Sequence, residues 1–403
     1  MTRLRLGDVA EVFNGKTPSV NDQRSNGHPV LKIRDITDER RFSGTFDSFV
    51  DIEFAERFSA KWICQDDTLI LNAAHNSDYV GSKTYLAETL VSGTLPTGEW
   101  LVVRPDPAKA NKRFIHYWLV SQRTRRQIRD RVKGIHLYPR DIADIPIWLP
   151  PIDDQRHIAT ILDKADVIRK ARRDAIELSE RLIRSTFLQQ LGNLSDQRLS
   201  VEELLPPTSN AIRTGPFGSQ LLHSEFTERG IPVLGIDNVV TNRFRWAERR
   251  YVSNDKYKEI SRYRVFPGDV MITIMGTTGR VCIAPENLPE CISTKHLCTI
   301  TPDRQRLLPE YLWASLLWDP VVRAQAAREG KGAIMEGWNM GLVRGLMIKL
   351  PPIFQQVHFA AFVRKVESLR SKFLAAEAES NQLFDSLAQR AFSGQLQEQS
   401  PCQ

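Results

Sequence analysis

Cysteine is scarce in this 403-residue sequence, and its five cysteines stand apart from one another. They number an odd five without any C-x-x-C pair, so their spacing indicates neither a disulfide framework nor a zinc site: Cys64, Cys282, Cys291, Cys298 and Cys402. The eight histidines form no H-x-x-x-H or H-E-x-x-H pair, and His296 and Cys298 have no further ligand nearby. We therefore expect reduced thiols and no metal site.

Long apolar runs are absent as well. None approaches the roughly 18 residues that suggest a membrane-spanning helix, and Met1 to Asp8 lacks the apolar core of a signal peptide. The composition, 41% hydrophobic and 26% charged, is typical of a folded globular chain. We expect a cytoplasmic protein without membrane contact.

Catalytic motifs are also missing. An adenine methyltransferase needs an N/D-P-P-Y/F turn, but Pro-Pro is followed by Ile152, by Ile353 and by Thr208. The stretch Gly81 to Thr84 lacks the glycine spacing of a phosphate-binding loop, and neither Pro-Asp pair leads to the E-x-K of a nuclease. We predict no catalytic residue, and the sequence favours binding over catalysis.

Positive charge is what the sequence has in excess. The formal net charge is +7 and the pI is near 9.2, which permits a polyanionic partner. The segment from Arg104 to Arg140 contains eleven Lys or Arg residues but only two acidic residues, Asp106 and Asp130. The run Arg123 to Lys133 fits either a helix that contacts phosphates or a solvated surface helix.

An internal repeat organises the chain. Leu149-Pro150-Pro151-Ile152 with Gln155 returns as Leu350-Pro351-Pro352-Ile353 with Gln356, at a constant offset of 201. Short β-branched runs bounded by Gly and Pro repeat upstream in the same order, and they predict strands in each half: Pro29 to Ile36, Thr68 to Asn72 and Trp100 to Arg104, then Ile231 to Ile236, Val270 to Ile274 and Leu297 to Ile300. The sequence therefore predicts two similar domains in tandem.

Each Leu-Pro-Pro introduces a stretch free of proline and glycine, from Asp153 to Gln190 and from Phe354 to Ser393. Apolar residues recur there at alternating spacings of four and three, which predicts a coiled-coil seam with Arg172 and Thr186 as polar departures. The predicted seam consists of Ile161, Ala165, Ile168, Ala175 and Leu182 in the first helix and Phe362, Val366, Leu369, Phe373, Ala376, Leu383 and Leu387 in the second.

We predict an α+β fold with two mixed α/β domains in tandem and two long helices that pair as an antiparallel, pseudo-twofold coiled coil. The predicted boundaries are 1–148 for the first domain, 149–193 for the central helix, 194–349 for the second domain, 350–396 for the C-terminal helix and 397–403 for a tail. A helix of 38 residues spans about 57 Å, more than the 34–36 Å of one duplex turn. Such a rod would separate two readers along DNA, unless each helix covers only its own domain.

The chain resembles the specificity subunits of type I restriction–modification systems. Besides the repeated Leu-Pro-Pro and Gln, the resemblance rests on motifs in order: Lys16-Thr17-Pro18-Ser19, Gly215-Pro216-Phe217-Gly218-Ser219-Gln220, Gly276-Thr277-Thr278-Gly279 and Lys331-Gly332. The first copy departs at Asn72 to Asn76, where the second has the glycine turn. The resemblance implies that two target-recognition domains bind double-stranded DNA. It also implies two adenine-methyltransferase subunits that bring S-adenosylmethionine, and two restriction subunits that join with ATP and Mg²⁺.

Polar and cationic residues near these motifs are our candidates for DNA contacts, because Lys and Arg position phosphates while Arg, Asn, Gln, Ser and Thr read base edges. They are Lys16, Thr17, Arg34, Lys83, Lys133, His136, Tyr138 and Arg140 in the first domain and Arg213, Ser219, Gln220, Thr277, Thr278, Arg280, Lys331 and Asn339 in the second. Each one also fits an ordinary surface residue.

The dissimilar sequences of the two domains outside the motifs predict a bipartite, asymmetric target. Two other classes of function stay open at this point. One is a self-contained enzyme that cuts or modifies DNA, and the other is a coiled-coil scaffold without a role on DNA.

Overall fold

The computed structural model describes residues 3–208, 210–247, 250–329, 337–393 and 395. The chain divides into two compact units, 1–173 with 375–403, and 174–374. Two long helices each begin in one unit and end in the other: α5 (Ile152–Gly192) and α10 (Ile353–Phe392). The predicted tail 397–403 and the candidate Lys331 lie outside the described residues, and the domain boundaries stay predictions.

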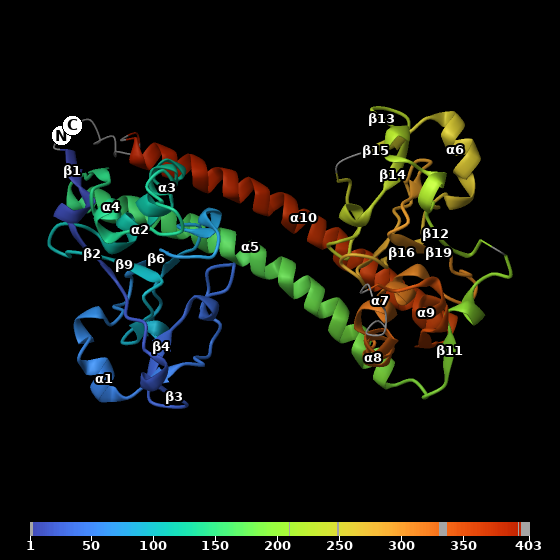
Figure 1. Ribbon diagram of the computed structural model, residues 1–403, viewed down its shortest axis with the longest axis horizontal. Coiled ribbons are helices and arrows are strands. Elements are labelled where there is room, and N and C mark those ends of the chain that lie inside the picture. Colours follow the sequence, from blue (N-terminus) through green and yellow to red (C-terminus); the bar gives the residue numbers. More distant parts are fainter. Residues whose placement is uncertain (1–2, 209, 248–249, 330–336, 394, 396–403) are drawn as a thin grey trace, which may run out of the picture. The chain divides into compact units, whose positions relative to one another are not determined.

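The first unit is built on two four-stranded sheets (Figure 1). The larger is antiparallel, in the order β2 (Ala10–Asn14), β9 (Trp100–Pro105), β6 (Thr68–Leu71) and β7 (Thr84–Leu86). The smaller has the order β3 (Gln23–Arg24), β5 (Phe49–Val50), β4 (His28–Leu31) and β8 (Leu95–Pro96), and only its β4–β8 pair is parallel. A two-stranded pair, β1 (Arg3–Arg5) with β10 (Pro146–Trp148), and four short helices complete the unit: α1 (Ile52–Glu56), α2 (Lys112–Val120), α3 (Gln122–Arg129) and α4 (Pro139–Ala143).

The second unit repeats this plan strand for strand. Its antiparallel sheet has the order β12 (Ile212–Thr214), β19 (Leu297–Ile300), β16 (Val270–Thr273) and β17 (Val281–Ile283). The smaller sheet has β13 (Phe226–Thr227), β15 (Arg250–Val252), β14 (Ile231–Leu234) and β18 (Ile292–Ser293), again with one parallel pair, β14–β18. The remaining elements are the pair β11 (Arg198–Ser200) with β20 (Met347–Lys349) and the helices α6 (Asn254–Ile260), α7 (Pro309–Trp318), α8 (Pro320–Glu329) and α9 (Met340–Gly345). The predicted fold class, two α+β domains with a pair of long helices, is confirmed.

The repeated Leu-Pro-Pro and glutamine attach each long helix to a domain. The helices begin at Ile152 and Ile353, directly after the prolines. Gln356 is fully buried; its Oε1 accepts from the Leu308 amide at 2.9 Å and its Nε2 donates to the Arg306 and Pro351 carbonyls at 2.9 and 3.0 Å. Gln155 makes the equivalent bonds to the Asn111 amide and the Pro150 carbonyl, both at 2.8 Å. One amide side chain thus satisfies backbone groups of two elements that burial would otherwise leave unpaired.

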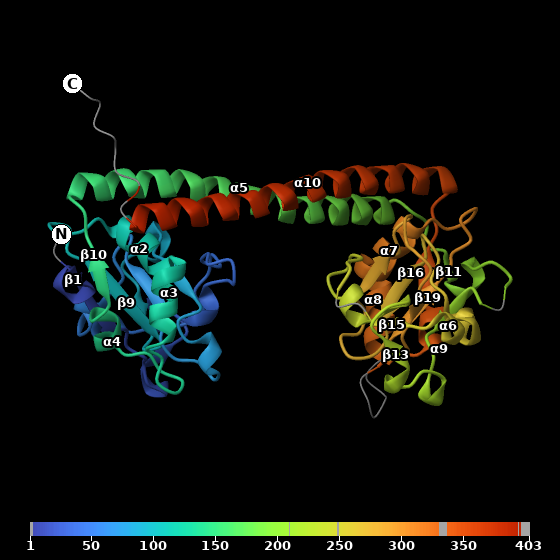
Figure 2. The ribbon, with the colours of Figure 1, turned by 90° about the horizontal axis from the view of Figure 1, so that it is seen from above.

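The two long helices run side by side in opposite directions within each unit (Figure 2). In the first unit Arg173 of α5 pairs with Glu377 of α10 at 3.2 Å, and the Arg169 guanidinium lies 4.2 Å from the Phe384 ring centroid. In the second, Phe187 of α5 packs on Phe359 of α10 with ring centroids 5.9 Å apart. These contacts are antiparallel, as the sequence predicted.

The buried seam differs from the predicted one at four of its twelve residues. Ala165 and Val366 are buried as predicted, and the predicted seam residues Ile161, Ala175, Phe362, Phe373, Ala376 and Leu387 are partly buried. The prediction is wrong for four residues that are exposed to 48%, 49%, 44% and 55%: Ile168, Leu182, Leu369 and Leu383. For Leu182 and Leu383 the buried residue is the next one along the helix, Ile183 and Phe384, each of which packs against a domain core. Neither neighbour of Ile168 or of Leu369 is buried.

Candidate DNA interface

The carboxyl ends of the parallel strands define equivalent places in the two units. Thr97, after β8, donates its amide to Leu31 of β4 at 3.0 Å, and Thr294, after β18, donates to Leu234 of β14 at 2.9 Å. Two residues on, the carbonyls of Glu99 and His296 accept from the Asn72 and Ile274 amides, each at 2.9 Å. The two units therefore share one backbone frame here, and the side chains on it can be compared one by one.

In each unit a glycine allows the N-terminal motif to pack directly against the backbone that follows the parallel strand. A methyl group on Gly15 would lie 2.2 Å from the Pro96 carbonyl oxygen, and one on Gly215 would lie 2.1 Å from the Ser293 carbonyl oxygen. Backbone does not yield to such an overlap, so only glycine fits. The candidates Lys16 and Thr17 follow directly in the first unit, as Ser219 and Gln220 follow in the second.

In the first unit most candidates gather around the turn after β6. Leu137 donates its amide to the Asn72 carbonyl at 2.8 Å, which brings the segment 133–140 beside the turn 72–76. That segment carries four exposed candidates: Lys133, His136, Tyr138 and Arg140. Lys16 and Thr17 are also exposed, and Thr17 Oγ1 accepts from the Gly98 amide at 2.8 Å.

Three first-unit candidates form ion pairs inside the unit. The Lys133 ammonium donates to the Asp141 carboxylate at 2.8 Å. Arg34 pairs with Asp47 at 2.7 Å on the surface. The Lys83 ammonium donates to the Ile36 carbonyl at 2.7 Å and lies 3.4 Å from an Asp38 carboxylate oxygen. Lys83 therefore holds a loop in place, whereas the exposed Arg34 stays within reach of a ligand.

In the second unit the glycine turn 276–279 lies in the same position. Trp338 donates its amide to the Ile274 carbonyl at 2.8 Å, as Leu137 does to Asn72. Thr277 and Arg280 are exposed, and Thr278 is half-buried. Asn339 is exposed, but its side chain caps α9 by accepting the Leu342 amide at 2.8 Å.

Arg213 is a structural residue and not a surface reader. It is 5% exposed, and its guanidinium donates to Asp269 at 2.5 Å, to the Arg264 and Asn210 carbonyls at 2.8 Å and to Thr301 Oγ1 at 2.9 Å. Burial raises the pKa of the Asp269 carboxyl, and the Arg213 charge opposes that rise. Since all three guanidinium nitrogens donate inside the domain, we withdraw Arg213 from the candidate DNA contacts.

In the first unit a buried aspartate is also paired with an arginine, but this arginine lies on a different strand. Asp67, which stands where Asp269 stands, pairs with Arg104 of β9 at 2.7 Å. By strand register Arg104 corresponds to Thr301, and Phe13 of β2 corresponds to Arg213. Each buried aspartate thus has an arginine partner, but that arginine comes from β9 in the first unit and from β12 in the second.

The basic helix α3 presents part of its charge to solvent. Thr124 and Ile128 are buried, whereas Arg123, Arg126 and Arg129 are exposed on the other faces. This arrangement fits both readings of the basic run, the phosphate-contacting helix and the solvated one.

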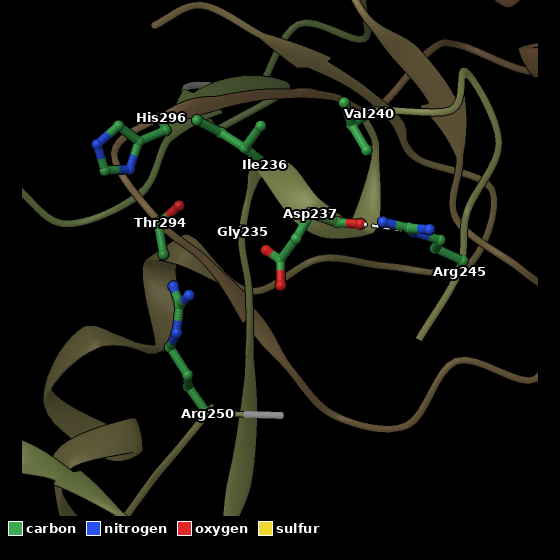
Figure 3. Close-up of a pocket in the computed structure, with 8 residues that line it drawn as sticks. All are labelled: Gly235, Ile236, Asp237, Val240, Arg245, Arg250, Thr294 and His296. Carbon is green, nitrogen blue, oxygen red and sulfur yellow. Dashed lines mark hydrogen bonds between the residues drawn. The ribbon is translucent and has the colours of Figure 1, made fainter. Parts of the chain in front are cut away.

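The second unit also holds a cleft that the sequence did not indicate. Its volume is about 490 Å³, and it is lined by Gly235, Ile236, Asp237, Val240, Arg245, Arg250, Thr294 and His296 (Figure 3). It lies at the carboxyl ends of β14 and β18, beside the start of β15. Of the lining residues, Gly235 and Ile236 belong to a predicted strand and His296 was considered as an isolated ligand type, whereas the other five belong to no motif.

Both motifs of the second unit converge on this cleft. Gly215 abuts the Ser293–Thr294 backbone, and a methyl group on Gly276 would lie 3.2 Å from Ile236 Cδ1. Burial lowers the pKa of His296, and the neighbouring cations Lys295 and Arg250 lower it further, so its imidazole is neutral at pH 7. The cleft is therefore placed where the predicted recognition loops meet.

At the equivalent places the first unit carries different side chains. Lys32 stands for Gly235, since each donates its amide to the side chain three residues on, to Asp35 Oδ2 at 2.7 Å or Asn238 Oδ1 at 2.8 Å. By the same registers the position of Asp237 is occupied by Arg34, that of His296 by Glu99 and that of Arg250 by Ser48. The frame is shared, but each of these four positions carries a different charge in the two units.

Metal and membrane features are not found in the part of the chain that the structure describes. Among those residues no three His, Cys, Asp or Glu side chains group as metal ligands, and no helix has the length and hydropathy needed to cross a bilayer. Burial raises the pKa of Cys291 and Cys298 to about 12, so these thiols are not nucleophiles at neutral pH.

Comparison with known proteins gives one consistent family. Residues 1–178 match the type I restriction modification DNA specificity domain. The EcoBI specificity subunit of a type I restriction enzyme from Escherichia coli is 22% identical over 98% of this chain and 86% of its own. In fold, the S subunit of a type I restriction–modification system from M. genitalium matches 97% of this chain and 96% of its own, with a TM-score of 0.57 and 12% identity. A chain from a study of complex assembly in the type I system gives 0.51 at 17% identity, with 98% of both chains covered.

Residues 1–178 thus match the model of the type I specificity-domain family, and almost the whole chain is similar to a type I restriction enzyme specificity subunit. The resemblance stated from the motifs is confirmed.

Proposed function

We propose that this chain is the sequence-specific DNA-binding subunit of a type I restriction–modification complex. Each unit reads one half-site of a bipartite target in double-stranded DNA. The observation that carries this proposal is that the two units share their backbone hydrogen bonds at this place but differ in the side chains. Lys32 stands where the second unit has Gly235, and Arg34 stands where it has Asp237. Two units with the same frame but different recognition chemistry suit two different half-sites, so the target is asymmetric.

The long helices hold the partner subunits. Ile168 and Leu369 lie 201 residues apart, as do Leu182 and Leu383, and all four are 44–55% exposed on the helix pair. Exposed large apolar residues that repeat at equivalent positions in both units favour two copies of one partner. In the proposed complex these partners are two adenine-methyltransferase subunits, and two restriction subunits join them.

The catalytic chemistry is assigned to the partners. S-adenosylmethionine would bind the methyltransferase subunits, and ATP with Mg²⁺ the restriction subunits. This chain supplies no catalytic residue and acts in the cytoplasm, where the DNA is.

The test uses the purified complex of this chain with an adenine methyltransferase from the same genome. We expect specific binding to one duplex sequence, with a logarithmic affinity that falls linearly with the logarithm of the salt concentration. Salt-insensitive or absent binding by a stable complex would favour the scaffold. Methylation or cleavage by this chain alone, given S-adenosylmethionine, ATP and Mg²⁺, would favour the self-contained enzyme.

A further inference from the structure

The cleft of the second unit contains polar groups that are not engaged inside the protein. Within the described part of the chain, the Asp237 carboxylate, the Arg250 guanidinium and the His296 imidazole have no hydrogen bond or ion pair, and Thr294 Oγ1 is buried without a partner. Figure 3 shows Asp237 and Arg250 pointing into the same space in front of Gly235. Among these described residues, Thr294 Oγ1 is the buried atom that lacks a partner, whereas the half-buried Asp237 and the exposed Arg250 are free to bind a ligand. Free groups of both charges around one cavity fit a ligand with matching donors and acceptors.

The presence of both a cation and a carboxylate in the cleft favours a base-pair edge over a backbone phosphate as the part of DNA that binds there. A phosphate would meet the Arg250 cation favourably, but it would also meet the Asp237 carboxylate, which repels it. The major-groove edge of a G·C pair offers both complements side by side, two acceptors on guanine, O6 and N7, and one donor on cytosine, the N4 amino group. Arginine binds the first as a bidentate donor, and a carboxylate accepts from the second.

We propose that this cleft reads one G·C base pair of the second half-site, with Arg250 on guanine and Asp237 on cytosine. This inference rests on the proposed function and adds to it a base pair and the residues that select it.

Neighbouring residues hold the two readers in place. Arg245 donates through Nε to the Asp237 carbonyl oxygen at 3.0 Å, which fixes the turn that carries the carboxylate. Gly235 keeps the floor of the cleft open, because a methyl group there would lie 2.7 Å from Asp237 Oδ1 and 3.6 Å from Arg250 Nη1.

The first unit lacks this combination. Lys32 occupies the floor position, and Arg34, at the place of Asp237, pairs with Asp47 at 2.7 Å. The proposal therefore assigns the G·C contact to one half-site only, in keeping with an asymmetric target.

The experiment selects duplexes from a library randomised across both half-sites, using the complex of this chain with its methyltransferase subunits. Arg250→Gln removes the bidentate donor to guanine, and Asp237→Asn replaces the carboxylate acceptor. Gly235→Ala displaces the Asp237 carboxylate without a change of charge; its φ of −121° and ψ of −172° are accessible to alanine. The control is Arg304→Gln, beside Gly268 at the opposite end of β16 from the glycine turn.

We expect Arg250→Gln and Asp237→Asn to lose discrimination at the same base pair, by about tenfold or more, while all other positions of both half-sites keep their preference. Gly235→Ala should relax that position too, and Arg304→Gln should select the wild-type sequence. Thermal unfolding of each variant complex shows whether it remains folded.

Three results overturn the proposal. If the wild-type complex selects a sequence and both variants select the same one, the cleft does not read DNA, although the proposed function stands. If Arg250→Gln weakens binding equally for all sequences and reduces the salt dependence, Arg250 is a phosphate contact. If the wild-type complex selects no sequence at all, the proposed function fails and this inference fails with it.

Discussion

Removal of Arg213 should destabilise the second unit rather than impair DNA reading. In Arg213→Ala the Asp269 carboxylate, 1% exposed, loses its charge partner, and the Arg264 and Asn210 carbonyls lose their donors. Breaking a buried ion pair by removing one member costs about 3–5 kcal/mol, because the remaining charge stays buried. For a unit of this size that corresponds to a fall in melting temperature of roughly 10 °C.

Two further variants test the same reasoning. The double variant R213M/D269N removes both charges, and we expect it to recover most of the lost stability. The variant R213F/T301R moves the arginine to the strand that carries Arg104 in the first unit, and we expect it to be more stable than Arg213→Ala. The assay is thermal unfolding by circular dichroism, with DNA affinity measured below the transition.

The pH dependence of Arg213→Ala gives an internal check. Without the arginine, the pKa of Asp269 rises above its already raised position, so the carboxyl takes up a proton in the folded state at a higher pH than in the unfolded state. A carboxyl whose pKa is higher in the folded state than in the unfolded state destabilises the fold when it is ionised, above that pKa. The destabilisation decreases as the carboxyl becomes protonated at lower pH. The deficit should therefore shrink as the pH falls from 7 toward 5. A variant that is as stable as wild type but binds DNA weakly would refute this account and restore Arg213 as a DNA contact.

The remaining predictions concern the helices and one histidine. Gln356→Leu should lower the free energy of unfolding by about 2–4 kcal/mol, since three backbone groups lose their partner, whereas Gln356→Glu should cost less because it keeps the acceptor for the Leu308 amide; chemical denaturation measures both. Leu182→Asp should leave the chain folded and weaken its association with the methyltransferase subunits, while Ile183→Asp, at a fully buried position, should unfold it; equal effects in unfolding and pull-down assays would contradict the seam. Burial lowers the pKa of His116 to about 3, so the unfolded chain takes up a proton below pH 6.5 that the folded chain refuses, and stability should fall by up to about 1.4 kcal/mol per pH unit between pH 6.5 and 3. His116→Asn should flatten that slope in pH-dependent melting, and an unchanged slope would show that another group is responsible.

The repeat and the long helices could be predicted because their signals are local. Pro-Pro cannot continue a helix, so Ile152 and Ile353 begin new ones, and an uninterrupted run without proline or glycine sets their length. The role of Gln155 could not be predicted, since its partners at Asn111 and Pro150 are defined only by the folded domain.

Eight of the twelve predicted seam residues are buried or partly buried, and four are exposed. Spacings of four and three define the apolar stripe, but at some positions either of two adjacent apolar residues fits it. Leu182 is apolar and fits the periodicity, so it was predicted to be buried in the seam. The residue that is buried is its neighbour Ile183. A helix that keeps an apolar face for a partner subunit misleads any rule that equates apolar with buried.

The sequence predicted the loops of the candidate interface, but it did not predict the side chains that we propose to contact the bases. The motifs around Gly215 and Gly276 do meet, because glycine marks the close approaches of backbone. Asp237 follows β14 and Arg250 begins β15, neither within a motif, and it is the antiparallel pairing of these two strands that brings them to one cleft. Arg213 was misassigned because its buried partner, Asp269, lies 56 residues away in the sequence.

The central claim is tested most directly by mapping methylated adenines across the genome of a host that expresses this chain together with its methyltransferase subunit. The account predicts one bipartite motif with a fixed gap and two different half-sites. A palindromic motif, a single contiguous motif, or unmethylated DNA despite a stable complex would contradict it.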